Sequence, residues 1–494
     1  MTHTHTVRTR LLTLSAALLL ATPAQAVPDL NATVNVGLVL EPTNLDIRNT
    51  AGIALDQVLI DNVYQGLVSR TQDGRIVPGL ASRYSVSEDG LTYTFNIRNG
   101  VTFHSGKPFT VNDVVWSLNQ VRTTPTLRGN ADLKNVQSIT SPNATTVVLR
   151  LKKPDAALLW NLSGRAGLVL EQAATNALTT TANGTGPYKL SSWKQGDSLT
   201  LVRNDAYWGK KAQVARVVFK YIPDGTAAVN ATLSGDLDVQ TAVDSNLLDK
   251  IRANRNFTVV TGRTTDKYTL AFNNARAPLN DLRVRQAIRQ AIDHKAIIAV
   301  LNGYGVQQGG PIAAGDPGYA SLTGIDSYNP VRARNLLAQA GQKNLTLTLT
   351  IPSFYGTTVS DVLTTQLAKV GITLKVKQVE FAAWLKDVYT NKDYDLSYVD
   401  HAEARDFSNW ANPQYYFNYN NAKVQALYAQ ALSSTTERGS AAKLAEAAKL
   451  VAQDAPADWL YTAKTITAIR KSITGVPTNF TSARLNLAGL TVNR

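Results

Sequence analysis

The side chains that could do chemistry gather in residues 395–419. Three acids, Asp400, Glu403 and Asp406, stand there close to His401. A pair of carboxylates at a fixed separation can hydrolyse a glycosidic bond, because one group protonates the leaving oxygen while the other acts as base or nucleophile. Acidic residues are common, so this spacing alone leaves an exported carboxylate-dependent hydrolase as one hypothesis among others.

The same segment is rich in aromatic side chains. Aromatic rings favour removal from water, whereas carboxylates lose free energy when they leave water without a partner. The surrounding elements must therefore bury the rings while something else pairs with the acids. The rings in question are Tyr398, Trp410, Tyr415, Tyr416, Phe417 and Tyr419.

Motifs of known catalytic and cofactor sites are missing from the sequence. Beyond residue 26 the histidines are His104, His294 and His401, which are far apart and form no HExxH pair, so we expect no metal site. The sequence has no G-x-S-x-G elbow and no phosphate-binding lysine loop, and the glycines of residues 303–310 do not fit a dinucleotide loop. We therefore expect no cofactor and no catalytic residue, and a binding protein rather than an enzyme.

The first 26 residues have the features of a signal peptide. Arg8 and Arg10 give a positively charged start, and residues 11–21 form an apolar stretch too short to span a bilayer. Residues 24–26 read AQA, a small-x-small cleavage site, so we expect cleavage after Ala26. No later stretch of the sequence is long and apolar enough to span a membrane.

The chain contains no cysteine. This removes disulfides, thiolate metal sites and cysteine nucleophiles, and it also removes the cysteine that bacterial lipoproteins acylate after cleavage. We therefore expect an exported protein that is free in the periplasm and not lipid-anchored.

Length and composition predict a globular protein of several domains. A chain of 494 residues corresponds to two to four domains, and a hydrophobic content of 44% can bury large cores. The formal net charge is +14, but the basic residues are scattered, which is typical of a solvated surface. A basic nucleic-acid binder is the remaining alternative from charge, and we expect no nucleic-acid partner.

Periodic patterns in the first half predict strands and capped helices. Residues 92–98 alternate apolar and polar side chains, as in a half-buried strand. A helix is predicted to follow, with Thr110 and Asp113 as its capping box. Another helix is predicted between two strands, with Asp224 as its cap and Gly235 at its end.

After residue 270 the patterns indicate strands alternating with helices, which is typical of an α/β domain. One helix is predicted from Asn280 or Asp281 to Gly303, and a second over residues 329–341. Residues 345–351 predict a strand with leucine and isoleucine on one face. A third helix and a further strand are predicted over residues 357–377.

Four stretches, taken together and in order, resemble family 5 of the bacterial extracellular solute-binding proteins, the oligopeptide, dipeptide and nickel-type receptors of ABC importers. The first contains DGRIVPGLASRYSVSEDGLTYTFNIRNGVTFHSGKPFTVNDV, and the second opens with NGTGPYKL. The third contains LAFNNARAPLNDLRVRQAI, and the fourth reads YNPVRARNLLAQAG. The stretches lie at residues 63–118, 183–209, 270–312 and 328–341 and extend over most of the chain beyond the signal peptide.

The resemblance implies an α/β fold of the periplasmic-binding-protein type II, class C. In this fold two lobes with mixed sheets are joined by a hinge, a third domain is inserted, and ligand is enclosed between the lobes. The implied division is a signal peptide at 1–26, domain I at 27–50, 183–269 and 466–494, domain II as an insertion at 51–182, and domain III at 270–465.

The resemblance also implies which residues contact the ligand. Residues 401–413 are similar to a segment that lines the cleft in peptide-binding members, where an aspartate pairs with the α-amine of the peptide, and Asp406 aligns with it. Phe407 stands where the family has proline, and neighbouring Arg405 offers Asp406 an alternative partner, so both roles remain open. The full set of expected contacts is Asp406, Trp410, Tyr398, Arg405, His401, Tyr355 and Ser353.

The expected function follows from the resemblance. The protein would capture a small solute, most simply a short peptide, by closing two lobes around it, and would deliver it to an inner-membrane ABC permease whose ATPase is a separate chain. We expect a monomer. A nickel or metallophore complex and an oligosaccharide are the alternative ligands within the same fold.

Overall fold

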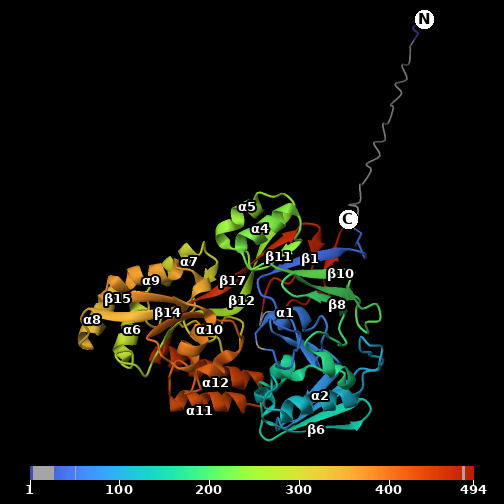
Figure 1. The fold of residues 1–494 in the computed structure, drawn as a ribbon, viewed down its shortest axis with the longest axis horizontal. Coiled ribbons are helices and arrows are strands. Elements are labelled where there is room, and N and C mark those ends of the chain that lie inside the picture. Colours follow the sequence, from blue (N-terminus) through green and yellow to red (C-terminus); the bar gives the residue numbers. More distant parts are fainter. Residues whose placement is uncertain (4–26, 51, 481–483, 494) are drawn as a thin grey trace.

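The computed structural model describes residues 1–3, 27–50, 52–480 and 484–493 (Figure 1). Almost all of the predicted signal peptide, including its apolar stretch and cleavage site, lies outside these ranges and stays a prediction. Among the described residues, none of the helices combines the length and the hydropathy that crossing a membrane requires.

One large sheet runs through most of the molecule. It has eleven strands, and its central path is β15-β14-β16-β12-β17-β11-β1-β10-β9-β8, with β13 paired to β17. The strands are β1 (Thr33–Leu38), β8 (Tyr188–Lys194), β9 (Ser198–Arg203), β10 (Arg216–Tyr221), β11 (Val239–Gln240), β12 (Phe257–Phe272), β13 (Gly305–Val306), β14 (Leu345–Pro352), β15 (Ile372–Val379), β16 (Leu396–His401) and β17 (Ala457–Arg470).

The two long strands β12 and β17 connect the halves of this sheet. They pair antiparallel from Phe257 opposite Arg470 to Ala271 opposite Ala457. At one end β17 pairs with the short β11, and at the other end β12 pairs with β16. The register between β12 and β17 shifts between Arg263 and Lys267, so the pairing is irregular where the chain passes from one half to the other.

A smaller sheet forms a separate layer of the fold. Its order is β4 (Ala81–Val86), β5 (Thr92–Ile97), β7 (Thr146–Leu151) and β6 (Val136–Asn143), and α2 (Val111–Thr123) packs against it. In Figure 1 this layer lies below the strands of the first half of the large sheet. The predicted strand at 92–98 is confirmed as β5.

Buried side chains divide the molecule into three packed bodies, which we name here. The insert has its core between Leu67 and Val169. The second body has its core between Leu270 and Tyr461. The first body comprises β1, β8 to β11 and the C-terminal residues that pack with them.

Most predicted helix boundaries are confirmed because the capping chemistry is local. The main chain of Thr110 donates to the carboxylate of Asp113 at the start of α2. Asp224 accepts from the main chain of Ala227 at the start of α4 (Gly225–Ser234). Asn329 caps α8 (Pro330–Gln339), and α9 (Thr358–Ala368) matches the helix predicted after the leucine-rich strand.

The prediction of one continuous helix from residue 280 to Gly303 is wrong. The structure has two helices, α6 (Leu282–Ala291) and α7 (His294–Val300). Ile292 is extended, and the carboxylate of Asp293 accepts from the main chain of Lys295 and Ala296. Asp293 therefore starts a new helix, because a capping side chain satisfies the free N–H groups of a fresh first turn.

The remaining elements are short or peripheral. The helices are α1 (Ala54–Leu59), α3 (Leu158–Leu162), α5 (Leu248–Arg252), α10 (Phe381–Trp384), α11 (Ala422–Leu432) and α12 (Glu437–Asp454), and the strands are β2 (Val68–Arg70), β3 (Ile76–Pro78), β18 (Ile473–Thr474) and β19 (Thr491–Val492). Short 3₁₀ segments lie at Ala131–Leu133, Arg165–Gly167, Gln172–Ala177, Ser245–Leu247, Ser353–Tyr355 and Asp406–Asn409, and a π-helical segment at Leu385–Thr390 follows α10 directly.

Candidate functional site

A buried ion pair lies where β12 passes into the second body. Lys267 is 1% exposed, and its Nζ lies 3.2 Å from Oδ1 of Asp406. The same ammonium donates to the carbonyl oxygens of Thr265 at 3.1 Å and Glu403 at 3.0 Å. All three N–H donors of Lys267 therefore have an acceptor, and its charge is fixed inside the protein.

The pair shifts the pKa values of both partners. Burial by itself lowers the pKa of Lys267, but the carboxylates of Asp406 and Asp316 outweigh it and raise that pKa. Burial raises the pKa of Asp406 to about 6, although the nearby Lys267 acts in the opposite direction. At neutral pH both groups are charged, so Asp406 already has a cation as its partner.

Arg405 is engaged elsewhere. Its main-chain N–H donates to the carboxylate of Asp316 at 2.8 Å, and its φ of 57° places it in the left-handed region. Its guanidinium lies 3.9 Å from the ring centroid of Trp160 in the insert, and the guanidinium of Arg70 lies at the same distance from that ring. Two planar groups this close to one ring must occupy its two faces. Among the described residues, the ion pair of Asp406 is therefore the one with Lys267.

Four tyrosines pack together on one face of the sheet beside this pair. Tyr268 stacks on Tyr461 with ring centroids 4.7 Å apart, and Tyr355 lies 5.5 Å from Tyr398. The hydroxyls of Tyr398 and Tyr461 are 2.8 Å apart, which fixes both rings. The structure thus brings together two of the expected contact residues, Tyr355 and Tyr398, with two that sequence reasoning missed.

Two further acids lie on the tyrosine face. Tyr268 pairs with Asp400 across β12 and β16, and the main-chain N–H of Asp400 donates to the hydroxyl of Tyr355 at 3.0 Å. Burial raises the pKa of Asp266 to about 7, with Lys267 opposing the shift. Burial, followed by the charge of Asp266, raises the pKa of Asp400 well above its ordinary value. The site holds more acids than bases, so a cation placed here would be stabilised.

One oxygen of this acid group is left without a hydrogen bond. Asp400 Oδ1 is buried and accepts from none of the residues that the structure describes. A buried carboxylate oxygen without a donor loses free energy relative to water. An ammonium or N–H group from outside the chain would supply that donor.

Three residues of the 401–413 segment lie within the second body instead. Trp410 stacks on Phe417 at 4.4 Å and is buried. His401 is buried against Tyr416, and its Nε2 lies 3.0 Å from the hydroxyl of that tyrosine. Burial lowers the pKa of His401 to about 3, so the ring is neutral. Phe407 is also buried, and its ring centroid lies 5.6 Å from that of Tyr428.

The remaining expected contact, Ser353, lies at the end of β14, at the edge of the tyrosine group. Its hydroxyl donates to Oε1 of Glu380 at 3.2 Å. Next to it Phe354 is 65% exposed and contacts the ring of Tyr355 at 4.5 Å. This end of β14 therefore carries rings that are partly open to solvent beside the buried tyrosine group.

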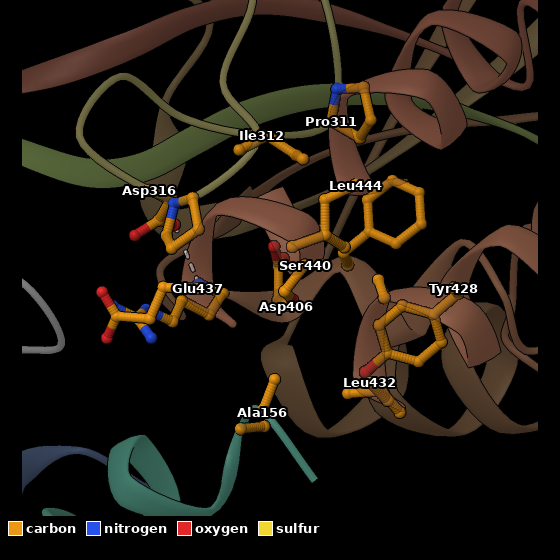
Figure 2. A pocket seen from close by; sticks show the side chains of 15 residues that line it. Ala156, Pro311, Ile312, Asp316, Asp406, Tyr428, Leu432, Glu437, Ser440 and Leu444 are labelled. Carbon is orange, nitrogen blue, oxygen red and sulfur yellow. Dashed lines mark hydrogen bonds between the residues drawn. The ribbon is translucent and has the colours of Figure 1, made fainter. Parts of the chain in front are cut away.

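A cavity of about 120 Å³ lies between the insert and the second body, next to Asp406 (Figure 2). Figure 2 shows Ala156 of the insert on the side of the cavity opposite Ile312 and Leu444. The main-chain N–H of Ala156 donates to the carbonyl of Leu432 in α11 at 2.9 Å. The two bodies are thus in direct contact at the edge of this cavity.

Sequence reasoning missed Lys267, although a signal was present. It is a charged residue just before the apolar end of β12, Leu270–Phe272, and charged side chains are rarely buried without a partner. That signal predicts a buried ion pair but does not name the partner. Asp406 is 139 positions further along the chain, since 406 minus 267 is 139, and only the fold brings the two together.

Comparison with known proteins identifies the family. The profile of the bacterial extracellular solute-binding proteins, family 5 (middle region), matches residues 75–426. The chain therefore belongs to this family, as the resemblance in its sequence predicted. Its fold is the α/β fold of the type II periplasmic binding proteins, with several domains and mixed sheets.

Individual relatives agree with this assignment. A putative ABC transporter peptide-binding protein of Brucella ovis is 31% identical over 332 residues, which cover 64% of this chain but only 62% of the relative. A glutathione-binding protein of Pectobacterium atrosepticum is 26% identical over 93% of both chains. A periplasmic binding protein of Helicobacter pylori, solved in complex with the peptide STSA, superposes with a TM-score of 0.81 at 22% identity and covers 94% of this chain and 98% of its own.

Proposed function

We propose that this protein is the periplasmic substrate-binding component of an ABC importer and that its solute is a short peptide. It would enclose the peptide between the first and second bodies, without breaking a bond, and pass it to a membrane permease whose ATPase is a separate chain. The family assignment and the names of the relatives support a binding protein of an importer. A peptide suits such a site because its main-chain amides offer the same hydrogen bonds whatever its side chains are.

The observation that carries the proposal is the acid and tyrosine group at the crossing of β12 between the bodies. Asp266 and Asp400 are carboxylates in a poorly hydrated site, where an ion pair is stronger than at a surface. Tyr268 and Tyr355 lie beside them as rigid walls. This combination fits the ammonium of a peptide with its first residues.

The role of the aligned aspartate changes under this proposal. Asp406 remains part of the site, but its charge is already balanced by Lys267. The ammonium of the peptide would instead meet Asp400, which has a buried oxygen without a donor among the described residues. Tyr355, Tyr398 and Ser353 would lie near the peptide, while Trp410 and His401 would support the site from the core of the second body.

Binding is tested with the purified protein lacking residues 1–26. A pool of di- to pentapeptides is expected to raise its melting temperature, because a ligand that binds only the folded state stabilises it. Native mass spectrometry should then find the bound peptides with their masses unchanged. Cleaved peptides or cleaved glycans would favour the hydrolase hypothesis, and no stabilisation by any peptide would contradict the proposed ligand.

The ammonium site is tested by Asp400→Asn. The unmodified protein should bind a free-amine peptide at least about tenfold more tightly than its N-acetylated form, and the substitution should remove most of that difference. Asp249→Asn, on an exposed side chain in α5, is the matched control. If Asp406→Asn abolishes the difference while Asp400→Asn does not, the ammonium meets Asp406 and the assignment to Asp400 is wrong.

A further inference from the structure

The cavity beside Asp406 has walls from two bodies that are far apart in the sequence. Ala156 and Ala157, at the start of α3, form the wall on the insert. Helices α11 and α12 and the loop around Ile312 form the wall on the second body. A group bound inside therefore contacts both bodies at once, and it contacts them only when they are close together.

The wall of the cavity is mainly carbon. Ile312, Phe407, Ala431 and Leu444 supply apolar side chains, and the two alanines of the insert leave space rather than fill it. Such a lining favours apolar groups, because it offers few hydrogen bonds and removes carbon surface from water.

The two carboxylates at the inner wall, Asp316 and Asp406, already have partners, and Asp316 accepts from the main-chain N–H of Arg405 at 2.8 Å. Asp406 lines the cavity, but its negative charge is balanced by the ammonium of Lys267, which is buried inside the second body. Glu437 is exposed and lies at the outer rim, where water solvates it. The interior is therefore suited to an uncharged group, even though three acids appear among the residues around it.

The size of the cavity narrows the choice of occupant. An apolar cavity of about 150 Å³ in another protein binds benzene, and a cavity needs polar partners as well as space to hold water well. At about 120 Å³ this cavity matches a branched aliphatic side chain better than an indole or a long charged chain.

We propose that this cavity is a specificity pocket that binds one branched aliphatic side chain of the solute, leucine, isoleucine or valine, and that Lys267 keeps it suited to an uncharged group by balancing Asp406. This inference rests on the proposed function, since it concerns a side chain of the captured peptide. The side chain would join the insert to the second body, so its burial would favour the closed arrangement over an open one.

The test uses a tripeptide scan. Starting from trialanine, each position is replaced in turn by leucine, valine, tryptophan, lysine or aspartate, and binding is measured by isothermal titration calorimetry. At one position leucine or valine should bind at least about tenfold more tightly than alanine, because a few buried carbons give this discrimination. Lysine and aspartate should bind more weakly than leucine there.

A cavity-filling variant locates the effect. In Ala431→Leu the added carbons occupy the cavity from α11, so the ratio of leucine to alanine affinity should fall toward one. Ala429→Leu, on the exposed side of the same helix, is the matched control and should keep the ratio. Circular dichroism and melting temperature show whether each variant is folded.

A second variant tests the part of Lys267. In Lys267→Met the negative charge of Asp406 has no cation beside it. The preferred residue at the aliphatic position of the peptide should therefore shift from leucine toward lysine. Lys267→Met combined with Asp406→Asn removes the unbalanced charge of Asp406 and should restore the preference for leucine.

The outcomes separate this inference from the proposed function. The pocket assignment is overturned if peptides bind but no position prefers an aliphatic residue. It is also overturned if Ala431→Leu leaves the preference intact. In both cases the proposed function as a peptide receptor still stands. If no peptide binds at all, the proposed function fails first. An unchanged preference in Lys267→Met would overturn the role of Lys267 alone.

Discussion

At the scale of single residues, partners decide what a charged side chain does. Asp406 and Asp400 are six positions apart in the sequence (406 minus 400), and both are shielded from water. Asp406 forms an ion pair with Lys267, whereas Asp400 has an oxygen without a donor among the described residues. Chemically the two residues are identical. The position of one ammonium is the reason why we propose a structural role for Asp406 and a binding role for Asp400.

The ion pair itself should be important for stability. Lys267→Met leaves Asp406 buried without its cation, and breaking one side of a buried pair destabilises a protein by about 3–5 kcal/mol. Urea unfolding at pH 7 measures this loss. Lys267→Met with Asp406→Leu should lose less than Lys267→Met alone, because the carboxylate of Asp406 is no longer left buried without its cation. Equal losses would show that the lysine acts through packing and not through charge.

Two histidines should affect stability with opposite signs as the pH falls. Nε2 of His104 lies 3.0 Å from the carbonyl of Gly186, and the main chain of Gly184 donates to Nδ1, which fits a neutral ring. Burial lowers the pKa of His104 to about 4, below the value near 6.5 of an unfolded chain. Between these values the unfolded chain binds more protons, so stability falls on acidification by up to about 1.4 kcal/mol per pH unit.

The measurement compares variants from pH 7.5 to pH 4.5. The advantage of the unmodified protein over His104→Gln should shrink as the pH falls. For His294, burial acts to lower the pKa, but the carboxylate of Asp458 outweighs it and raises that pKa. The advantage over His294→Gln should therefore grow as the pH falls through the folded pKa. Parallel pH profiles for the two variants would contradict this assignment of protonation states.

At the scale of elements, short-range signals explain both the helix boundaries that were predicted correctly and the helix break that was not. Capping residues and terminal glycines placed α2, α4, α8 and α9 correctly because those contacts lie within a few residues. The break between α6 and α7 was missed because apolar residues continue across it with nearly helical spacing. Asp293 has the right chemistry for a cap, but it also tolerates the interior of a helix, and only packing decides between the two.

The break should depend on its cap. Asp293→Ala removes the acceptor for the N–H groups of Lys295 and Ala296, so the free energy of unfolding should fall by about 1 kcal/mol. Asp249→Ala, whose side chain is exposed in the first turn of α5, should change it by less than half as much. Thermal or urea unfolding measures both. If Asp293→Ala has no effect, the helix start is fixed by the surrounding packing.

At the scale of the whole molecule, contacts between the bodies hold the arrangement seen in the structure. The ring of Trp160 lies between the guanidinium groups of Arg70 and Arg405, which belong to different bodies. Each cation–π contact contributes on the order of 0.5–2 kcal/mol. This sandwich therefore favours the arrangement seen in the structure over one in which the insert and the second body are apart.

Loss of the sandwich should open the molecule. The chain has no cysteine, so cysteines placed at the exposed Glu88 and Lys343 can carry a donor and acceptor dye pair. In Trp160→Ala, single-molecule energy transfer without peptide should show a smaller closed fraction, and peptide affinity should fall several-fold because closure is less favourable. The closed fraction of Trp160→Phe should lie between those of the unmodified protein and Trp160→Ala. An unchanged closed fraction would show that the sandwich is not a closing contact.

The sequence by itself determined what depends on neighbouring residues and on motif order. Alternation placed the strands, capping chemistry placed most helices, and four ordered stretches identified the family and its fold. The tertiary structure alone decided the neighbours of the charged groups: Lys267 with Asp406, Arg405 with Trp160, and Asp266 beside Asp400. The reason is physical, since local patterns record hydrogen bonds and burial within a few residues, whereas electrostatic partners are set by distances in space between segments that the chain order leaves far apart.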